Sequence, residues 1–250
     1  TINSLQKNSF YDHEIIIHIN NGSDGSLDYV KKNNFLYTYS NTNIGLCSAV
    51  NKGSLKSTTN YIFYSHDDMF YCKNWDLYLE KEVNKIDNKF FYLSGTTVSI
   101  KNGLINRNYG FSPSSFDEVK FNKFCNNDKS QDLQGSHWAP HLIHRDLWIK
   151  IGGFSEEFNP GDGSDPDLCM KLWLNNVRIF KCISKLKVYH FSSITTRKSS
   201  VILNKGTKTF LLKYGFNPRF FREYYLKGNG INIFQGKLSE PKITYNMALS

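Results

Sequence analysis

Two carboxylates stand side by side after a stretch of sequence that is typical of a buried strand. Residues 61–64 are aromatic or β-branched, and Asp67 and Asp68 follow where such a strand should end. Ligands bind at the carboxyl ends of strands in open α/β sheets, and two neighbouring acids repel each other unless a cation or hydrogen-bond donors offset the charge. The pair is therefore either part of a ligand site or an ordinary turn or helix cap.

A second acidic group lies in residues 161–168, Gly-Asp-Gly-Ser-Asp-Pro-Asp-Leu. Pro166 suits the first position of a helix, which predicts that Asp165 is the N-cap of that helix. Backbone N–H groups and the helix dipole hold an N-cap carboxylate in its ionised form and lower its basicity. Downstream, His190 lies in the strand-like run 187–191. A single histidine on a strand is either a core residue or a ligand, and the pattern leaves both open.

The elements that must position these residues alternate between strand and helix. Short apolar runs predict strands, and apolar residues at helical spacing predict helices. Alternation with short loops predicts an α/β fold with a doubly wound, mainly parallel sheet flanked by helices, as in Rossmann-like proteins. The stretch 102–135 is irregular. The expected strands are 14–19, 35–40, 61–64, 90–94, 96–100, 178–182 and 187–191, and the expected helices are 26–32, 46–53, 75–86, 115–124, 166–174, 205–214 and 218–225.

Composition points to a folded protein of a reducing compartment. Hydrophobic residues make up 40% of the 250 residues and aromatic residues 15%, which argues against disorder. No run reaches the length of a membrane-spanning helix, and no signal-peptide pattern is visible. The five cysteines are odd in number and show no CxxC spacing, which favours a cytoplasmic protein without structural zinc.

The net charge of +9 arises mainly from the C-terminal third of the chain. Such a basic face can attract nucleic acid, anionic lipid or a phosphorylated substrate, or it can be a lysine-rich solvated surface. Peripheral contact with an anionic membrane is therefore one expectation. The basic residues concerned are Arg197, Lys198, Lys205, Lys208, Lys213, Arg219 and Arg222.

Four motifs, in this order and spacing, resemble family 2 glycosyltransferases with the nucleotide-diphosphosugar-binding GT-A fold. Residues 15–25 resemble the family's strand followed by Asp-Asp/Asn-Gly-Ser-Thr-Asp, and residues 43–53 resemble its Asn-x-Gly helix. Residues 61–68 resemble the strand with the Asp-x-Asp motif. Residues 152–168 resemble Gly-Gly-Phe-Asp-Glu followed by Gly-x-Glu-Asp-x-Asp-Leu. The resemblance extends over residues 5–191.

This resemblance implies a metal-dependent, inverting transfer of a sugar from a nucleotide-diphosphosugar to an acceptor hydroxyl. Asp68 and His190 would bind the metal, Mn²⁺ or Mg²⁺, and an imidazole ligand favours Mn²⁺. Asp165 would be the catalytic base, with Asp167 and Asp162 as alternatives. The implied nucleotide contacts are Asn20, Asn43, Asn51 and Asp67; each of the three asparagines could instead be a turn or capping residue.

The chain also departs from the family pattern. The sequence starts inside a helix, at residues 1–6, so the family's first strand is missing. Asn20, His66 and Ser164 replace three acids of the motifs. These changes make a catalytically impaired GT-A-like binding domain the alternative interpretation. A basic nucleic-acid-binding protein ranks third, because the aromatic residues form no known motif of that class, and we expect no nucleic-acid partner.

The sequence therefore predicts two parts. Residues 1–198 would form a GT-A glycosyltransferase domain, incomplete at its N-terminus, and residues 199–250 a basic, partly helical extension. The acceptor would be a glycan, a lipid-linked glycan or a protein, in polysaccharide or glycoconjugate synthesis.

Overall fold

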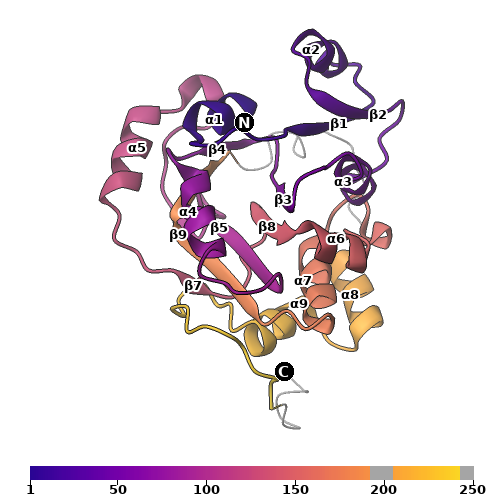
Figure 1. Cartoon of the computed structure of the whole chain (residues 1–250), viewed down its shortest axis with the longest axis vertical. Coiled ribbons are helices and arrows are strands. Elements are labelled where there is room, and N and C mark those ends of the chain that lie inside the picture. The colour runs from indigo at the N-terminus through magenta and orange to yellow at the C-terminus, as the bar shows by residue number, and fades with distance from the viewer. Residues whose placement is uncertain (192–204, 243–250) are drawn as a thin grey trace.

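The alternating segments fold into an α/β arrangement, as expected from the sequence. The computed structural model (Figure 1) describes residues 1–191 and 205–242. Its strands are β1 (Ile16–Asn20), β2 (Leu36–Ser40), β3 (Tyr61–Tyr64), β4 (Met69–Tyr71), β5 (Phe91–Ser99), β6 (Ile105–Asn106), β7 (Leu133–Gln134), β8 (His141–His144) and β9 (Ile179–His190). Its α-helices are α1 (Ile2–Asn8), α2 (Ser26–Lys32), α3 (Leu46–Ser54), α4 (Trp75–Val83), α5 (Glu118–Asn127), α6 (Arg145–Ile151), α7 (Ser164–Leu174), α8 (Gly206–Tyr214) and α9 (Pro218–Phe220).

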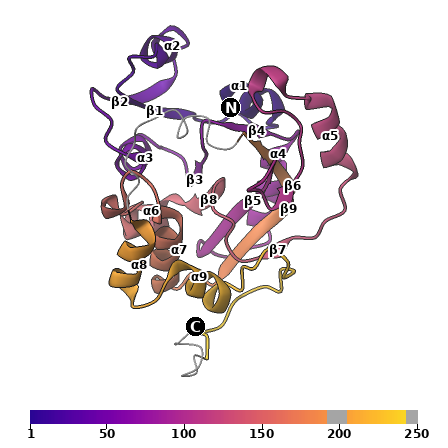
Figure 2. The same ribbon diagram turned by 180° about the vertical axis from the view of Figure 1, so that it is seen from behind.

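The large sheet is mixed rather than mainly parallel. Its order is β3-β8-β5-β9-β4, with β6 beside β5 and β7 beside β9. The central pair β5–β9 is parallel, whereas β8 and β4 run antiparallel to their neighbours. Helices α1 and α5 lie on one side of this sheet and α6, α7 and α8 on the other, as both views show (Figures 1 and 2).

Strands β1 and β2 form a parallel pair of their own. Together with α2 they lie apart from the large sheet (Figure 2). Within residues 1–191 and 205–242, no strand pairs with both β1 and β3, so the two sheets stay separate.

Two pairs of predicted strands are single long strands in the structure. Runs 90–94 and 96–100 are both in β5, and runs 178–182 and 187–191 are both in β9. The pairing of β5 with β9 changes register after Gly95. Gly95 lies opposite Ile183, whereas the next residue of β5 lies opposite Lys187. A side chain at Gly95 would approach Leu186 within 2.4 Å. The polar residues that suggested two strands therefore mark an irregularity inside one strand.

The C-terminal helices share the hydrophobic core of the domain. Phe210 of α8, Phe221 and Leu226 are fully buried in the same cluster as Phe154 and Trp173. The division of the chain at residue 198 stays a prediction, and residues 192–204 and 243–250 lie outside the described part. No helix of the described residues is long and apolar enough to cross a membrane.

Replacing Phe210 should destabilise the whole domain, because the residue is fully buried in the common core. We expect Phe210→Ala to lower the free energy of unfolding by about 3–5 kcal/mol, measured by denaturant titration. Leu212, on the same helix, is 75% exposed, and Leu212→Ala should change stability by less than about 0.5 kcal/mol. A Phe210→Ala variant with wild-type stability would show that α8 is not part of the cooperative unit.

Candidate active site

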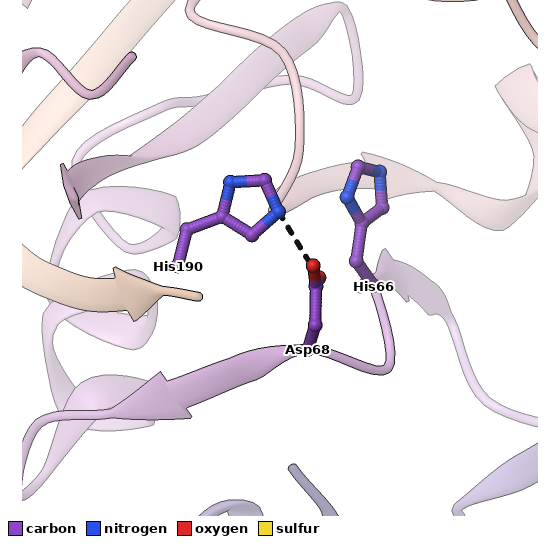
Figure 3. Close-up of side chains that lie close together, drawn as sticks. All are labelled: His66, Asp68 and His190. Atoms are coloured by element: carbon purple, nitrogen blue, oxygen red, sulfur yellow. Dashed lines mark ion pairs between the residues drawn. The ribbon is translucent and has the colours of Figure 1, made fainter. Parts of the chain in front are cut away.

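The pairing of β4 with β9 brings together residues from distant parts of the sequence. Met69, the first residue of β4, lies opposite His190, the last residue of β9. Asp68 immediately precedes β4, and its Oδ1 lies 3.0 Å from Nε2 of His190. His66 comes from the loop between β3 and β4 and points toward the same place (Figure 3). One potential ligand atom from each of the three side chains lies within 4.8 Å of the other two.

The backbone on both sides of Asp68 is held in place. The hydroxyl of Thr1 donates to the carbonyl of Asp67 at 2.5 Å and accepts from the N–H of Met69 at 2.9 Å. The N–H of Phe191 donates to the carbonyl of Asp68 at 3.0 Å. Asp68 therefore has a fixed position relative to β9, although it follows a loop.

The three side chains suit a divalent cation. An octahedral ion with ligands at about 2.1 Å separates adjacent ligand atoms by about 3.0 Å, the spacing of Asp68 and His190. The pKa of His66 is below its usual value because burial disfavours the charged ring, and the nearby His190 adds to this effect. A neutral imidazole can donate a nitrogen lone pair to a metal. A carboxylate with imidazoles is a donor set that Mn²⁺ accepts, whereas Mg²⁺ prefers oxygen alone.

Asp165 is not the N-cap of its helix, so that prediction was wrong. Helix α7 begins at Ser164, with Gly163 as its N-cap, and Asp165 is the second helical residue. Gly163 has a φ of 82°, a conformation that glycine adopts without strain. The hydroxyl of Ser164 donates to the carbonyl of Gly161 at 2.7 Å. The helix therefore starts two residues earlier than Pro166 suggested.

This position leaves the Asp165 carboxylate poorly solvated. Its Oδ1 is buried and has no hydrogen-bond partner within residues 1–191 and 205–242. Burial disfavours the negative charge and raises the pKa of Asp165 to about 7. The carboxylate is thus suited to take up and release a proton near neutral pH. The expectation of lowered basicity rested on the N-cap position and fails with it.

Asp167, one of the alternatives to Asp165, has a different environment. It is fully buried, and its carboxylate accepts from the hydroxyls of Ser155 at 2.6 Å and Tyr214 at 2.7 Å. The ammonium group of Lys213 lies 2.8 Å away. The contacts with Tyr214 and Lys213 join α8 to α7. No sequence pattern predicts these contacts, since Lys213 and Tyr214 lie far along the chain.

Asp162, the other alternative, is exposed, and its Oδ2 accepts from the N–H of Gly206 at 3.1 Å. The Asp162 side chain is therefore open to solvent, unlike the buried oxygen of Asp165. Of the three candidates, Asp165 has the carboxylate environment best suited to a base.

Asp165 and the acids of the β3–β4 loop converge on Tyr64. This tyrosine is buried at the end of β3, and its ring lies 5.4 Å from that of His66. Burial raises the pKa of Tyr64, and the charges of Asp165, Asp67 and Asp68 raise it further. The two acidic motifs of the sequence therefore act on one region of the molecule.

The three asparagines predicted to contact the nucleotide lie at the end of β1, in the loop before α3 and in α3 itself. Asn20 Oδ1 accepts from the N–H of Ile44 at 3.1 Å, and Asn43 Oδ1 accepts from that of Gly45 at 2.9 Å. The side-chain amide of Asn51 donates through Nδ2 to the carbonyl of Phe154 and accepts through Oδ1 from the N–H of Phe154, at 2.8 Å each. These three asparagines hold the loops together.

Asp67 is exposed beside the three-residue cluster of His66, Asp68 and His190. For the asparagines and for Asp67, contact with a nucleotide stays a prediction.

One histidine, His66, was missed as a potential metal ligand. His66 was noted only as a departure from the motif, but the structure places it with Asp68 and His190. His141 of β8 is fully buried, and neither ring nitrogen has a hydrogen-bond partner in the described part of the chain. It packs between Tyr64 and Tyr92, and burial lowers its pKa to about 3. A lone histidine in a short strand gives no sequence signal for such a position.

Comparison with solved structures finds the same fold in glycosyltransferases. The crystal structure of GalNAc-T7 with UDP, GalNAc and Mn²⁺ matches with a TM-score of 0.57 at 15% identity, over 76% of this chain and 40% of that one. S. aureus TarS 1–349 in complex with UDP matches with a TM-score of 0.56 at 14% identity, over 86% of this chain and 67% of that one. The complex of TarS 1–349 with UDP-GlcNAc matches with a TM-score of 0.57 at 15% identity, over 84% of this chain and 60% of that one.

The chain thus spans two fifths to two thirds of the length of these structures. A search of the curated proteins found no match. The sequence model of Glycosyl transferase family 2, in contrast, matches residues 1–183, which include both acidic motifs. This match covers well over half of the chain and agrees with the GT-A fold, so the chain belongs to glycosyl transferase family 2.

Proposed function

We propose that this chain transfers a sugar from a nucleotide-diphosphosugar to an acceptor hydroxyl, with a divalent cation and with inversion at the anomeric carbon. The observation that carries this proposal is the cluster of His66, Asp68 and His190 at the β4–β9 junction, together with the poorly solvated carboxylate of Asp165. The first could hold a metal at a diphosphate, and the second could accept a proton. Transfer to a hydroxyl needs both properties.

Asp68 and His190 would hold the cation, and His66 would be a third ligand. Their ligand atoms are already close, so only small side-chain movements are needed. When bound, a divalent cation neutralises the charge that develops on a leaving diphosphate. Three protein ligands leave positions open for diphosphate oxygens and water, which makes tight binding dependent on the nucleotide.

Asp165 would take the proton of the acceptor hydroxyl as that oxygen attacks. A base is most effective when its pKa is near the working pH, and burial puts the pKa of Asp165 at about 7. Asp167 would keep the first turn of α7 in place through Ser155 and Tyr214. In an inverting reaction the acceptor approaches from the face opposite the diphosphate, so base and cation act on opposite sides of the sugar.

The donor class is suggested by the structural neighbours, which were solved with UDP and UDP-GlcNAc. A UDP-sugar is accordingly the first donor to test. The acceptor would be a glycan, a lipid-linked glycan or a protein.

Contact of the C-terminal basic face with an anionic surface stays part of the proposal. Lys205, Lys208, Arg219 and Arg222 are exposed and available for it, and Arg197 and Lys198 lie outside the described residues. Lys213 is engaged in ion pairs with Asp167 and Glu157.

The alternative, a catalytically impaired binding domain, rests on Asn20, His66 and Ser164. Each has a role in this structure that is compatible with an active enzyme. Asn20 bonds to Ile44, His66 joins Asp68 and His190, and Ser164 bonds to Gly161 at the start of α7. These contacts are compatible with an active site that lacks the three acids, and we prefer the enzyme.

Removing a proposed metal ligand should weaken metal binding. We expect His190→Ala and His66→Ala each to lower the affinity for Mn²⁺ at least about tenfold, measured by calorimetric titration at fixed pH with UDP present. His144→Gln is the control, because His144 lies at the opposite end of the β3–β8 pair. If His190→Ala binds Mn²⁺ like the wild type, His190 is a core histidine rather than a ligand.

Asp165→Asn should nearly abolish transfer, because the amide cannot accept the proton. We expect kcat to fall by about 10²–10⁴ while the donor affinity changes by no more than a few-fold. In the wild type, kcat/KM should rise about tenfold per pH unit below the pKa of about 7 and level off above it. The exposed Asp162→Asn is the matched control. An Asp165→Asn variant that keeps most of its activity would transfer the role to Asp167 or Asp162.

A further inference from the structure

One buried tyrosine differs from the others in the described part of the chain. Four tyrosines are buried there: Tyr64, Tyr71, Tyr92 and Tyr189. The hydroxyls of Tyr71, Tyr92 and Tyr189 each donate a hydrogen bond of 2.6–3.2 Å to another residue of the chain. The hydroxyl of Tyr64 makes no hydrogen bond within residues 1–191 and 205–242. Because the hydroxyl of a buried tyrosine usually has a partner, this exception needs an explanation.

The ring of Tyr64 is buried, but its hydroxyl is accessible. The residue as a whole is only 8% exposed. Its hydroxyl oxygen, although unpaired, is not enclosed by protein, in contrast to Oδ1 of Asp165 and both ring nitrogens of His141. Tyr64 therefore presents its only polar side-chain atom at the molecular surface. A tyrosine hydroxyl both donates and accepts hydrogen bonds, so an oxygen of a bound ligand could be its partner.

Three neighbouring rings fix the position of the Tyr64 ring. Tyr64 is the last residue of β3, two residues before His66, and the centroids of these two rings lie 5.4 Å apart in an edge-to-face contact. The ring of Phe154 makes a second edge-to-face contact at 5.3 Å. His141, which lies opposite Tyr64 in the β3–β8 pair, packs against it at 5.2 Å. The hydroxyl therefore has a defined position beside the loop that carries His66 and Asp68.

Phe154 links Tyr64 to the first turn of α7. The residue after Phe154 is Ser155, whose hydroxyl donates to Oδ2 of Asp167 at 2.6 Å. Asp167 and Asp165 both belong to the first turn of α7. Tyr64 thus lies between the loop that carries the proposed cation ligands and the helical turn that carries the proposed base.

We propose that the hydroxyl of Tyr64 donates a hydrogen bond to an oxygen of the sugar that is transferred. This inference rests on the proposed function, in which the cation acts on the diphosphate at one side of the sugar and Asp165 acts at the other side. A group that lies between the two faces the sugar itself. Tyr64 is then a residue that recognises the sugar rather than the nucleotide, because a site built to bond a substrate oxygen discriminates against a ligand that lacks it.

Tyr64→Phe tests the proposal, because it removes the hydroxyl and keeps the ring contacts. Calorimetric titration with Mn²⁺ and without acceptor measures the affinities for UDP and for a UDP-sugar, the tightest binder among UDP-GlcNAc, UDP-GalNAc, UDP-glucose and UDP-galactose. We expect Tyr64→Phe to weaken binding of the UDP-sugar about tenfold, the effect of one lost hydrogen bond, and to change the UDP affinity by less than about twofold. The melting temperature of the free protein should stay at the wild-type value, because the hydroxyl has no partner in the described residues to lose.

Tyr61→Phe is the matched control, because Tyr61 is the first residue of the same strand and is 38% exposed. It should bind UDP and the UDP-sugar like the wild type. An unchanged affinity of Tyr64→Phe for the UDP-sugar, or an equal loss of affinity for UDP and the UDP-sugar, would overturn the inference and leave the proposed function standing. If the wild type binds neither UDP nor any of the UDP-sugars, the proposed function fails and this inference fails with it.

Discussion

The antiparallel pairing of β4 with β9 sets the geometry of the candidate cation site. It places Met69 opposite His190 and so brings Asp68 and His190 within 3.0 Å across a gap of 122 positions (190 − 68). The same pair holds Cys72 against Lys187 and fixes the loop that carries His66. A strand of three residues such as β4 would be marginal alone. It is stabilised here by its bonds to β9, the longest strand of the described residues, which lies in the core.

Two acids two residues apart on α7 show how local environment assigns chemical roles. Asp167 accepts hydrogen bonds from two hydroxyls and lies beside an ammonium group, and its contacts with Tyr214 and Lys213 join α7 to α8. Asp165 has a buried oxygen without a partner in the described residues, and burial raises its pKa. A residue that pays such a desolvation cost without hydrogen bonds is typical of a functional site. The contacts of Asp167 anchor the same turn of α7, and they offset the desolvation free energy of Asp165.

The sequence predicted the fold class, the family and most elements, because these depend on local patterns. Helix α2, for example, has the predicted limits Ser26–Lys32. The sequence could not predict that β5 and β9 each continue through a polar interruption, because the two strands shift register there and resume pairing beyond it. The start of α7 depended on the left-handed backbone of Gly163, which no residue pattern specified. The contact of Tyr214 with Asp167 arises only from tertiary packing.

One measurement tests directly whether the β4–β9 junction binds a cation together with the nucleotide. Crystals grown with Mn²⁺ and UDP should be measured at the manganese absorption edge. If the junction binds the cation, one anomalous peak should lie at bonding distance from the carboxylate of Asp68 and Nε2 of His190, next to the diphosphate. A bound diphosphate with the Asp68–His190 ion pair intact, and no anomalous peak between them, would contradict it.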